Sequence, residues 1–155
     1  MILTENARLR LRTMCRDDLE ELYALLSDAE VMRWLEPPIS RTQTEDFLEQ
    51  AGLSEPPLVY AAESSEGEFL GYAIYHGYDE RSCELGWVLK PAFWHKGYAD
   101  EMTDLLTALA RREGKDAVIE CAPGQTASAQ IARRHCFSCE GRAGGCDVYR
   151  LRCKE

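Results

Sequence analysis

Hydrophobic residues recur every second position in some segments of this 155-residue chain and every third or fourth position in others, and the order of these segments limits the available folds. A period of two is typical of strands, and a period near 3.6 is typical of helices. We expect strands at residues 7–12, 58–64, 69–76, 82–89 and 117–119, and a hairpin across 137–151. We expect helices at residues 17–27, 97–112 and 127–135, and a short helix from residue 42 towards residue 52.

This mixed order predicts one α/β domain over residues 1–155, with a mixed central sheet of about seven strands flanked by about four helices. Residues 58–89 are typical of an antiparallel meander, whereas the apolar segment 117–119 is typical of a buried parallel strand. Thr42 and Glu45 resemble a capping box that would begin the short helix. The strand–helix–strand–helix order of the second half is the kind of crossover at which α/β proteins usually bind ligands.

Acidic residues outnumber basic ones, and the formal net charge is −9. Nucleic-acid-binding proteins usually need a basic face that releases counterions, so we expect no nucleic-acid partner. An acidic surface favours encounter with cationic substrates such as amines or basic peptides. No apolar run approaches the roughly 20 residues that span a bilayer, and the first residues do not resemble a signal peptide. We therefore expect no membrane partner and a cytoplasmic protein.

Four of the seven cysteines fall in the last fifth of the chain, at Cys136, Cys139, Cys146 and Cys153. An odd number of cysteines without an export signal argues against a disulfide framework. A zinc-binding interaction domain is one alternative, but the spacing of the last two does not match a zinc knuckle. Cys146 and Cys153 are also separated by an odd number of positions, so side-chain alternation would place them on opposite sides of one strand. We expect no metal and interpret the cysteines as buried or half-buried thiols.

The segment from Glu84 to Glu101 passes from a strand, through a loop, into the start of a long amphipathic helix. The first turn of a helix has free N–H groups and the positive end of the helix dipole, and it can bind phosphate or pyrophosphate. Gly97 would let the backbone approach a phosphate, and Ala99 keeps the next contact small. From spacing alone, an ordinary strand–helix turn that needs a glycine explains the pattern equally well.

The same segment resembles the signature Q/R-x-x-G-x-G/A of GNAT acetyltransferases, which holds the pyrophosphate of coenzyme A. It is most similar to the branch of ribosomal-protein N-terminal acetyltransferases, through Glu84-Leu85-Gly86-Trp87 and then Trp94-His95-Lys96-Gly97-Tyr98-Ala99. A second match is Gly124-Gln125-Thr126-Ala127-Ser128, followed by Cys136-Phe137. Gln125 and Cys136 stand where that branch usually has Asn and Gly. The predicted element order also matches the GNAT fold over nearly the whole chain.

The resemblance implies acetyl-CoA as cosubstrate and acetyl transfer to a primary amine, either a protein N-terminus or a small amine. It also implies that a backbone N–H near Val88 polarises the thioester oxygen. The acceptor would be shaped by residues 30–53 and by the loop 77–81, and we expect a monomer or a homodimer. The cofactor-binding residues that it implies are Trp87, Val88, Leu89, His95, Lys96, Gly97, Tyr98, Ala99, Asp100, Gln125 and Ser128.

An amine must lose a proton before it attacks the thioester, so a positioned base is useful. Strand alternation puts Glu84 on the same face as Gly86, and we interpret Glu84 as the base, acting through a water molecule. An ion pair with a cation on a neighbouring strand is the alternative. Many family members place a tyrosine acid where Ala132 stands here, so Ser128 is the substitute, with His135 as a second candidate. The missing tyrosine also leaves open a CoA-binding sensor without catalysis.

Overall fold

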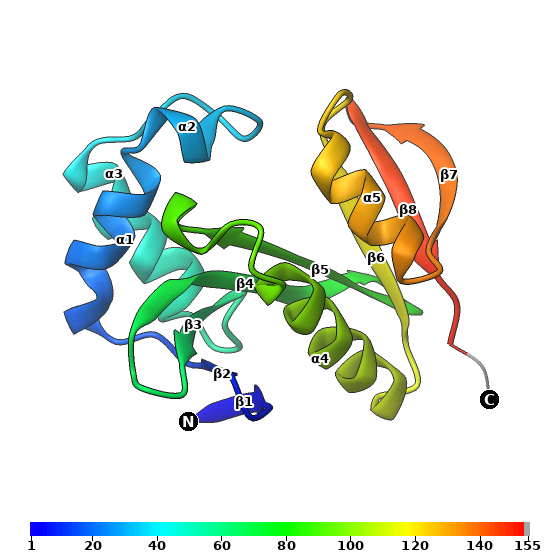
Figure 1. The fold of residues 1–155 in the computed structure, drawn as a ribbon, viewed down its shortest axis with the longest axis horizontal. Helices are drawn as coiled ribbons and strands as arrows, with labels where there is room; N and C mark the ends of the chain where they lie inside the picture. The colour runs from blue at the N-terminus through cyan, green and yellow to red at the C-terminus, as the bar shows by residue number, and fades with distance from the viewer. Residues whose placement is uncertain (154–155) are drawn as a thin grey trace.

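The structure, a computed structural model, describes residues 1–153, and within them eight strands form one sheet with five α-helices around it (Figure 1). The strands are β1 (Ile2–Glu5), β2 (Leu9–Arg12), β3 (Val59–Ser64), β4 (Phe69–Asp79), β5 (Ser82–Leu89), β6 (Asp116–Cys121), β7 (Ser138–Ala143) and β8 (Cys146–Leu151). The helices are α1 (Leu19–Leu26), α2 (Ala29–Met32), α3 (Arg41–Phe47), α4 (Tyr98–Arg112) and α5 (Thr126–Arg134).

The sheet has the order β1-β2-β3-β4-β5-β6-β8-β7, and its neighbours are antiparallel except for β5 and β6. This parallel pair extends only from Ser82 opposite Asp116 to Glu84 opposite Val118. Beyond that point β5 continues beside β4, whereas β6 continues beside β8. The sheet therefore parts into two halves, which carry α1 to α3 on one side and α5 on the other in Figure 1.

Two hydrophobic cores lie on opposite faces of the sheet, and the alternation of β5 divides its side chains between them. Leu85 and Leu89 belong to the core that contains Leu106 of α4. Val88 belongs to the core that contains Leu22 of α1. The face that carries Val88 also carries Glu84 and Gly86, so Glu84 lies on the face opposite α4.

The expected mixed α/β sheet is confirmed, with eight strands rather than about seven. The additional strand is β1, a four-residue edge strand without a buried residue, which gives no alternating pattern. The expected capping box at Thr42 and Glu45 is wrong. The box is formed by Ser40, whose Oγ accepts from the Gln43 N–H at 3.1 Å, and by Gln43, whose Oε1 accepts from the Ser40 N–H at 2.8 Å. Helix α3 consequently begins before the predicted cap, and a π-helical turn, Leu48–Gly52, follows it.

Close packing of β4 against β5 depends on Gly71, which has a φ of +151°. A Cβ atom at this position would lie 2.0 Å from the carbonyl oxygen of Val88. The Lys90 N–H then donates to the carbonyl of Leu70 at 2.9 Å. These contacts fix the end of β5, from which the candidate site is built.

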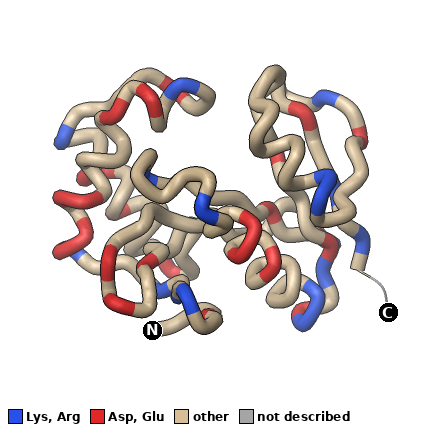
Figure 2. Tube along the Cα trace, viewed as in Figure 1, with Lys and Arg blue, Asp and Glu red and all other residues tan. Residues whose placement is uncertain are grey.

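Charged residues of both signs are distributed along the trace, with acidic positions at the start of α1 (Figure 2). Among residues 1–153 no helix is long and apolar enough to cross a membrane.

The cysteines differ in exposure from the sequence-based expectation. Cys146 and Cys153 are half-buried as expected, but Cys136 and Cys139 are exposed. The reason for Cys139 is that β7 is an edge strand on which every residue is exposed. In the described part of the chain, no three or more His, Cys, Asp or Glu side chains form a group that could hold a metal ion.

Candidate functional site

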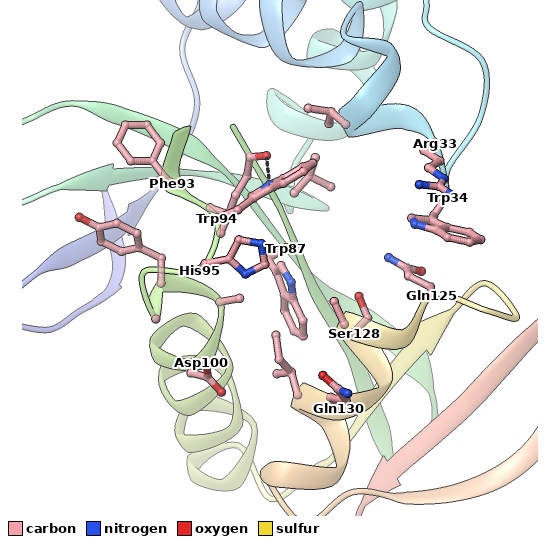
Figure 3. A pocket seen from close by; sticks show the side chains of 18 of the residues that line it. Arg33, Trp34, Trp87, Phe93, Trp94, His95, Asp100, Gln125, Ser128 and Gln130 are labelled. Atoms are coloured by element: carbon pink, nitrogen blue, oxygen red, sulfur yellow. Dashed lines mark hydrogen bonds between the residues drawn. The ribbon is translucent and has the colours of Figure 1, made fainter. Parts of the chain in front are cut away.

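A pocket of about 560 Å³ lies between the end of β5, the loop before α4, the α2 segment and the first turns of α5 (Figure 3). All of the expected cofactor-binding residues line it except Lys96, whose side chain is exposed. Of the two proposed catalytic residues, Ser128 lines the pocket and Glu84 does not. Folding thus brings the two sequence matches, which are separated by about 25 residues of α4 and β6, to opposite walls of one pocket.

The loop before α4 has the backbone geometry of an anion site. His95 and Gly97 both adopt left-handed conformations, with φ of 61° and 84°. Gly97 is the N-cap of α4, and the first hydrogen bond of the helix runs from the Glu101 N–H to the Gly97 carbonyl at 3.1 Å. The N–H groups of Tyr98 and Ala99 precede that bond and have no partner inside the helix. Such N–H groups at a helix start, together with the helix dipole, favour a bound anion.

Conformation rather than space explains the glycine at position 97. A Cβ atom there would meet its nearest neighbour, Nη1 of Arg8, at 3.7 Å, which is an ordinary contact. The left-handed φ is unfavourable for residues with a Cβ atom, whereas glycine adopts it freely. The alternative interpretation of Gly97, a turn that itself needs a glycine, therefore has a specific backbone reason.

Asn6 and Arg8, in the turn between β1 and β2, form a clamp that holds this loop in place. Arg8 donates from Nη2 to the Lys96 carbonyl at 3.1 Å, forms an ion pair with Glu101 and lies 4.3 Å from the ring centroid of Tyr98. Asn6 also donates to Glu101 at 3.0 Å. These partners lie some 90 residues before the loop in the chain, so no local pattern could have identified them.

The end of β5 offers an unpaired backbone edge to the pocket. Trp87, Val88 and Leu89 all line the pocket, and they come after the last pair that β5 makes with β6. Trp94 closes this part of the wall, because its indole Nε1–H donates to the Leu89 carbonyl at 2.9 Å. An extended ligand could pair with this edge as another strand would.

The α5 wall carries Gln125 and Ser128, which face the His95 and Trp87 side of the pocket in Figure 3. The side-chain oxygen of Gln125 accepts from the Ala122 N–H at 3.0 Å, so its amide NH₂ group is the end left for a ligand. Ser128 is half-buried, and its hydroxyl makes no hydrogen bond to any residue within 1–153. It is therefore available for chemistry. Ala132 is fully buried in the core and offers no functional group.

An ion-pair network joins the first turn of α4 to the end of α5. Arg134 donates from Nη2 to both carboxylate oxygens of Asp100, at 2.9 and 3.0 Å. The ring of His135 lies between Asp100 and Asp104, at 2.9 and 3.0 Å. Burial alone would raise the pKa of Asp100, but the hydrogen bonds from His135 and Arg134 outweigh it and lower that pKa. The network therefore compensates the charge of the Asp100 carboxylate beside the start of α4 and gives His135 a structural role.

Glu84 lies at the point where β5 and β6 separate, directly opposite His76 of β4. Its Oε1 lies 3.5 Å from Nε2 of His76, so the alternative of an ion pair with a neighbouring strand is present. Burial raises the pKa of Glu84, the charge of His76 lowers it and the nearby Glu120 raises it, with a net upward direction. A raised carboxyl pKa in a half-buried position is also what a general base needs, so the ion pair and the base role are compatible.

The α2 wall contains the residues that sequence reasoning missed, chiefly Glu30, Arg33 and Trp34. The Trp34 ring lies against Gly124 of the loop before α5, where a Cβ atom would meet it at 3.6 Å. Arg33 lies 5.0 Å from the Trp34 ring centroid. The expected acceptor region included this segment but named no side chain. One unused signal was the tryptophan content, because all three tryptophans of the chain line this pocket.

Comparisons with known proteins agree with this geometry. The model of a family described as "Acetyltransferase (GNAT) domain" matches residues 8–138. A search of curated proteins finds no match.

Solved structures have the same fold over nearly their full lengths. A GNAT-family acetyltransferase from Bacillus anthracis has a TM-score of 0.83 and 21% identity, covering 97% of this chain and 96% of that one. An acetyltransferase from Salmonella typhimurium that modifies the N-terminal serine of ribosomal protein L7/L12 has a TM-score of 0.83 and 19% identity, covering 99% and 100%. Spermidine N-acetyltransferase from Vibrio cholerae, in complex with CoA and spermine, has a TM-score of 0.74 and 20% identity, covering 94% of each chain.

Proposed function

The chain belongs to the GNAT family of acetyltransferases, which use acetyl-CoA, and we propose that it transfers the acetyl group to a primary amine by direct attack. The observation that carries this proposal is the start of α4, where left-handed Gly97 presents unpaired N–H groups to a pocket beside the free edge of β5. Residues 1–155 act in this proposal as one catalytic domain. The acceptor is a protein N-terminus or a small amine, the two classes named for the relatives from Salmonella typhimurium and Vibrio cholerae.

Two features of the pocket support coenzyme A as its ligand. The N–H groups of Tyr98, Ala99 and Asp100 would hold the pyrophosphate, because they lie at the positive end of the α4 dipole. The Asp100 carboxylate does not oppose this charge, since Arg134 and His135 neutralise it. The pantetheine arm would extend along Trp87 to Leu89, in the place that β6 leaves free.

Direct attack is favoured over a covalent cysteine intermediate because no cysteine lines the pocket among residues 1–153. The thiolate is the nucleophilic form of cysteine. Burial, followed by the charge of Asp147, raises the pKa of Cys121 to about 11, so this thiol stays protonated at neutral pH. Cys83 is buried in the core.

Proton transfer is assigned in this proposal to Glu84 and Ser128. A strand rises about 3.3 Å per residue, so Glu84 lies roughly 7 Å along β5 from Gly86. A water molecule between base and amine would lie beside Ile74, whose Cδ1 is 3.2 Å from the position of a Cβ atom at Gly86. Glu84 takes the proton of the ammonium group, and the neutral amine then attacks the thioester carbonyl. Ser128, whose hydroxyl has no partner among the described residues, donates a proton to the departing CoA thiolate and regains one from the nitrogen of the tetrahedral intermediate.

The test is release of CoA thiol from acetyl-CoA in the presence of a panel of amines, including peptides with a free N-terminus, polyamines and amino acids. Release that depends on one class of amine, with the acetylated product identified by mass spectrometry, supports the proposal. If CoA binds but no amine accelerates thiol release above the rate of hydrolysis, the proposal fails and the sensor alternative replaces it.

A further inference from the structure

His76 is the nearest partner of the proposed base, and its ring is held in one orientation. Its Nδ1 lies 2.9 Å from the carbonyl oxygen of Gly77. A carbonyl oxygen can only accept, so Nδ1 carries the proton of this contact. The other ring nitrogen, Nε2, therefore faces Oε1 of Glu84 at 3.5 Å.

This arrangement requires one proton shared between the two side chains. A neutral imidazole with its proton on Nδ1 has a lone pair on Nε2, which would face the lone pairs of an ionised carboxylate. A proton on either atom turns this repulsion into an attraction. The favourable states are an imidazolium beside a carboxylate, or a neutral imidazole beside a carboxylic acid.

The groups around the pair leave His76 as the cation that acts on Glu84. Glu120 of β6 adds negative charge and accepts a hydrogen bond from the Tyr78 hydroxyl at 2.7 Å. Arg150 of β8 is held by the carboxylates of Asp79, Asp116 and Glu140, at 3.1, 3.2 and 3.0 Å. These three carboxylates therefore compensate the positive charge of Arg150, which leaves His76 as the cation beside Glu84.

We propose that His76 is a positioning residue for acetyl transfer: it keeps the Glu84 carboxylate ionised and carries the proton that Glu84 removes from the acceptor amine out to solvent. This inference rests on the proposed role of Glu84 as the base. In the step, an ammonium N–H proton passes to the Glu84 carboxylate, which leaves a carboxylic acid beside the His76 imidazolium. The imidazolium then loses its own Nε2 proton to water or buffer, a path that the partial exposure of the side chain (28%) permits. The Glu84 proton moves to the vacated Nε2, and this restores the imidazolium beside the carboxylate.

The first experiment reads Glu84 directly and needs no acceptor. The carboxyl ¹³C signal of Glu84 is titrated in the wild type and in His76→Gln, Glu120→Gln and His76→Lys. We expect His76→Gln to raise the pKa of Glu84 by roughly 0.5 unit or more, and Glu120→Gln to lower it, because a nearby positive charge favours the carboxylate and a negative charge opposes it. His76→Lys keeps a cation and should prevent the rise. A Glu84 titration that is the same in all four proteins overturns the inference.

The second experiment measures the pH profile of kcat with the acceptor found in the amine screen. In His76→Gln the acid limb should move to higher pH, so that the rate falls most below pH 7 and recovers above it, with KM for acetyl-CoA unchanged. His76→Lys should keep the wild-type limb. If Glu84→Gln is slow but His76→Gln has a wild-type profile, His76 is not the positioning residue, although Glu84 remains the base. If Glu84→Gln is fully active, it is the proposed base that fails.

Discussion

Two walls of the pocket are built in different ways. The wall to which we assign the cofactor (the cofactor wall), residues 87–100, is one continuous segment that offers backbone N–H groups at a turn with left-handed His95 and Gly97. The wall to which we assign the acceptor (the acceptor wall), Glu30 to Leu35, offers side chains of the α2 segment, which tertiary folding brings beside the loop before α5. Trp34 on this wall is 39% exposed.

The difference indicates which of the two walls can be substituted without loss of the fold. A backbone anion site tolerates few substitutions, since it depends on φ angles and on the start of a helix. A wall of half-exposed side chains can be replaced without disturbing the core, so it can adapt to different acceptors. We therefore expect variants of the two walls to separate cofactor binding from acceptor selection.

The largest expected effect comes from Glu84, on the face of β5 opposite α4. Glu84→Gln keeps the shape of the side chain and removes the base, so kcat at neutral pH should fall about 10²-fold, within the range for general base catalysis. The affinity for CoA should stay the same. The Glu120→Gln variant is the matched control: it removes a neighbouring carboxylate but keeps the base, and because it should lower the pKa of Glu84 it should not reduce kcat at neutral pH.

The pH–rate profiles of the wild type and of Glu84→Gln should differ in a defined direction. Burial raises the pKa of Glu84 above the ordinary value of glutamate, so the wild-type rate should rise with pH through that raised pKa as the carboxylate forms. Glu84→Gln should lose this limb and recover rate at alkaline pH, where free amine forms unaided. A variant with wild-type rates at every pH would show that Glu84 has only a structural role.

The second effect concerns the cofactor wall. Gly97→Glu adds bulk, strain and negative charge at the anion site, and it should weaken CoA binding at least tenfold, equivalent to about 1.4 kcal/mol, in calorimetric titration. Gly67→Glu is the matched control, because Gly67 also has a left-handed φ, of 85°, in a turn with open space around it. If both variants bind CoA as the wild type does, the anion site lies elsewhere.

A smaller effect is expected on the acceptor wall. Trp34→Ala removes an aromatic side chain from the rim, and kcat/KM for the acceptor should fall by roughly tenfold, while Trp34→Phe keeps a ring and should lose less. CoA affinity should remain within about twofold, because the Trp34 ring lies across the pocket from Asp100 at the start of α4 (Figure 3). Equal losses in CoA affinity and acceptor kinetics would contradict the separation of the two walls.

The smallest effect is expected outside the pocket. Cys139 is exposed on β7 and Cys146 is half-buried on β8, and neither lines either wall. Replacing both with serine should leave CoA affinity and acceptor kinetics unchanged. Stoichiometric zinc in the purified wild type, measured by elemental analysis, would overturn the interpretation of these residues as ordinary thiols.

The sequence identified the pocket-lining residues of segment 87–100 better than those of the α2 segment for a physical reason. The alternation of β5 and the apolar stripe of α4 are local patterns, and they bracket the glycine turn that the anion site needs. The clamp by Arg8 depends on a contact between distant segments, which leaves no trace in local spacing. The α2 helix has only four residues, too few for a helical period to identify it.

For Glu84 too, the local sequence pattern predicted one property of the residue and missed another. Alternation correctly placed it on the face with Gly86 and Val88, but the register that sets His76 opposite it is a property of the folded sheet. Sequence reasoning could name a cation on a neighbouring strand as the alternative partner, yet it could not say which cation or how the pair shares its proton.

The most direct test of the account is a ¹H–¹⁵N NMR titration of the wild-type protein with CoA, because the central claim concerns backbone N–H groups at the start of α4. We predict that the largest amide shifts fall on residues 95–101, followed by residues 87–89, and that α2 shifts less. Shifts confined to α2, or spread over the surface with none at Gly97 to Asp100, would contradict the account.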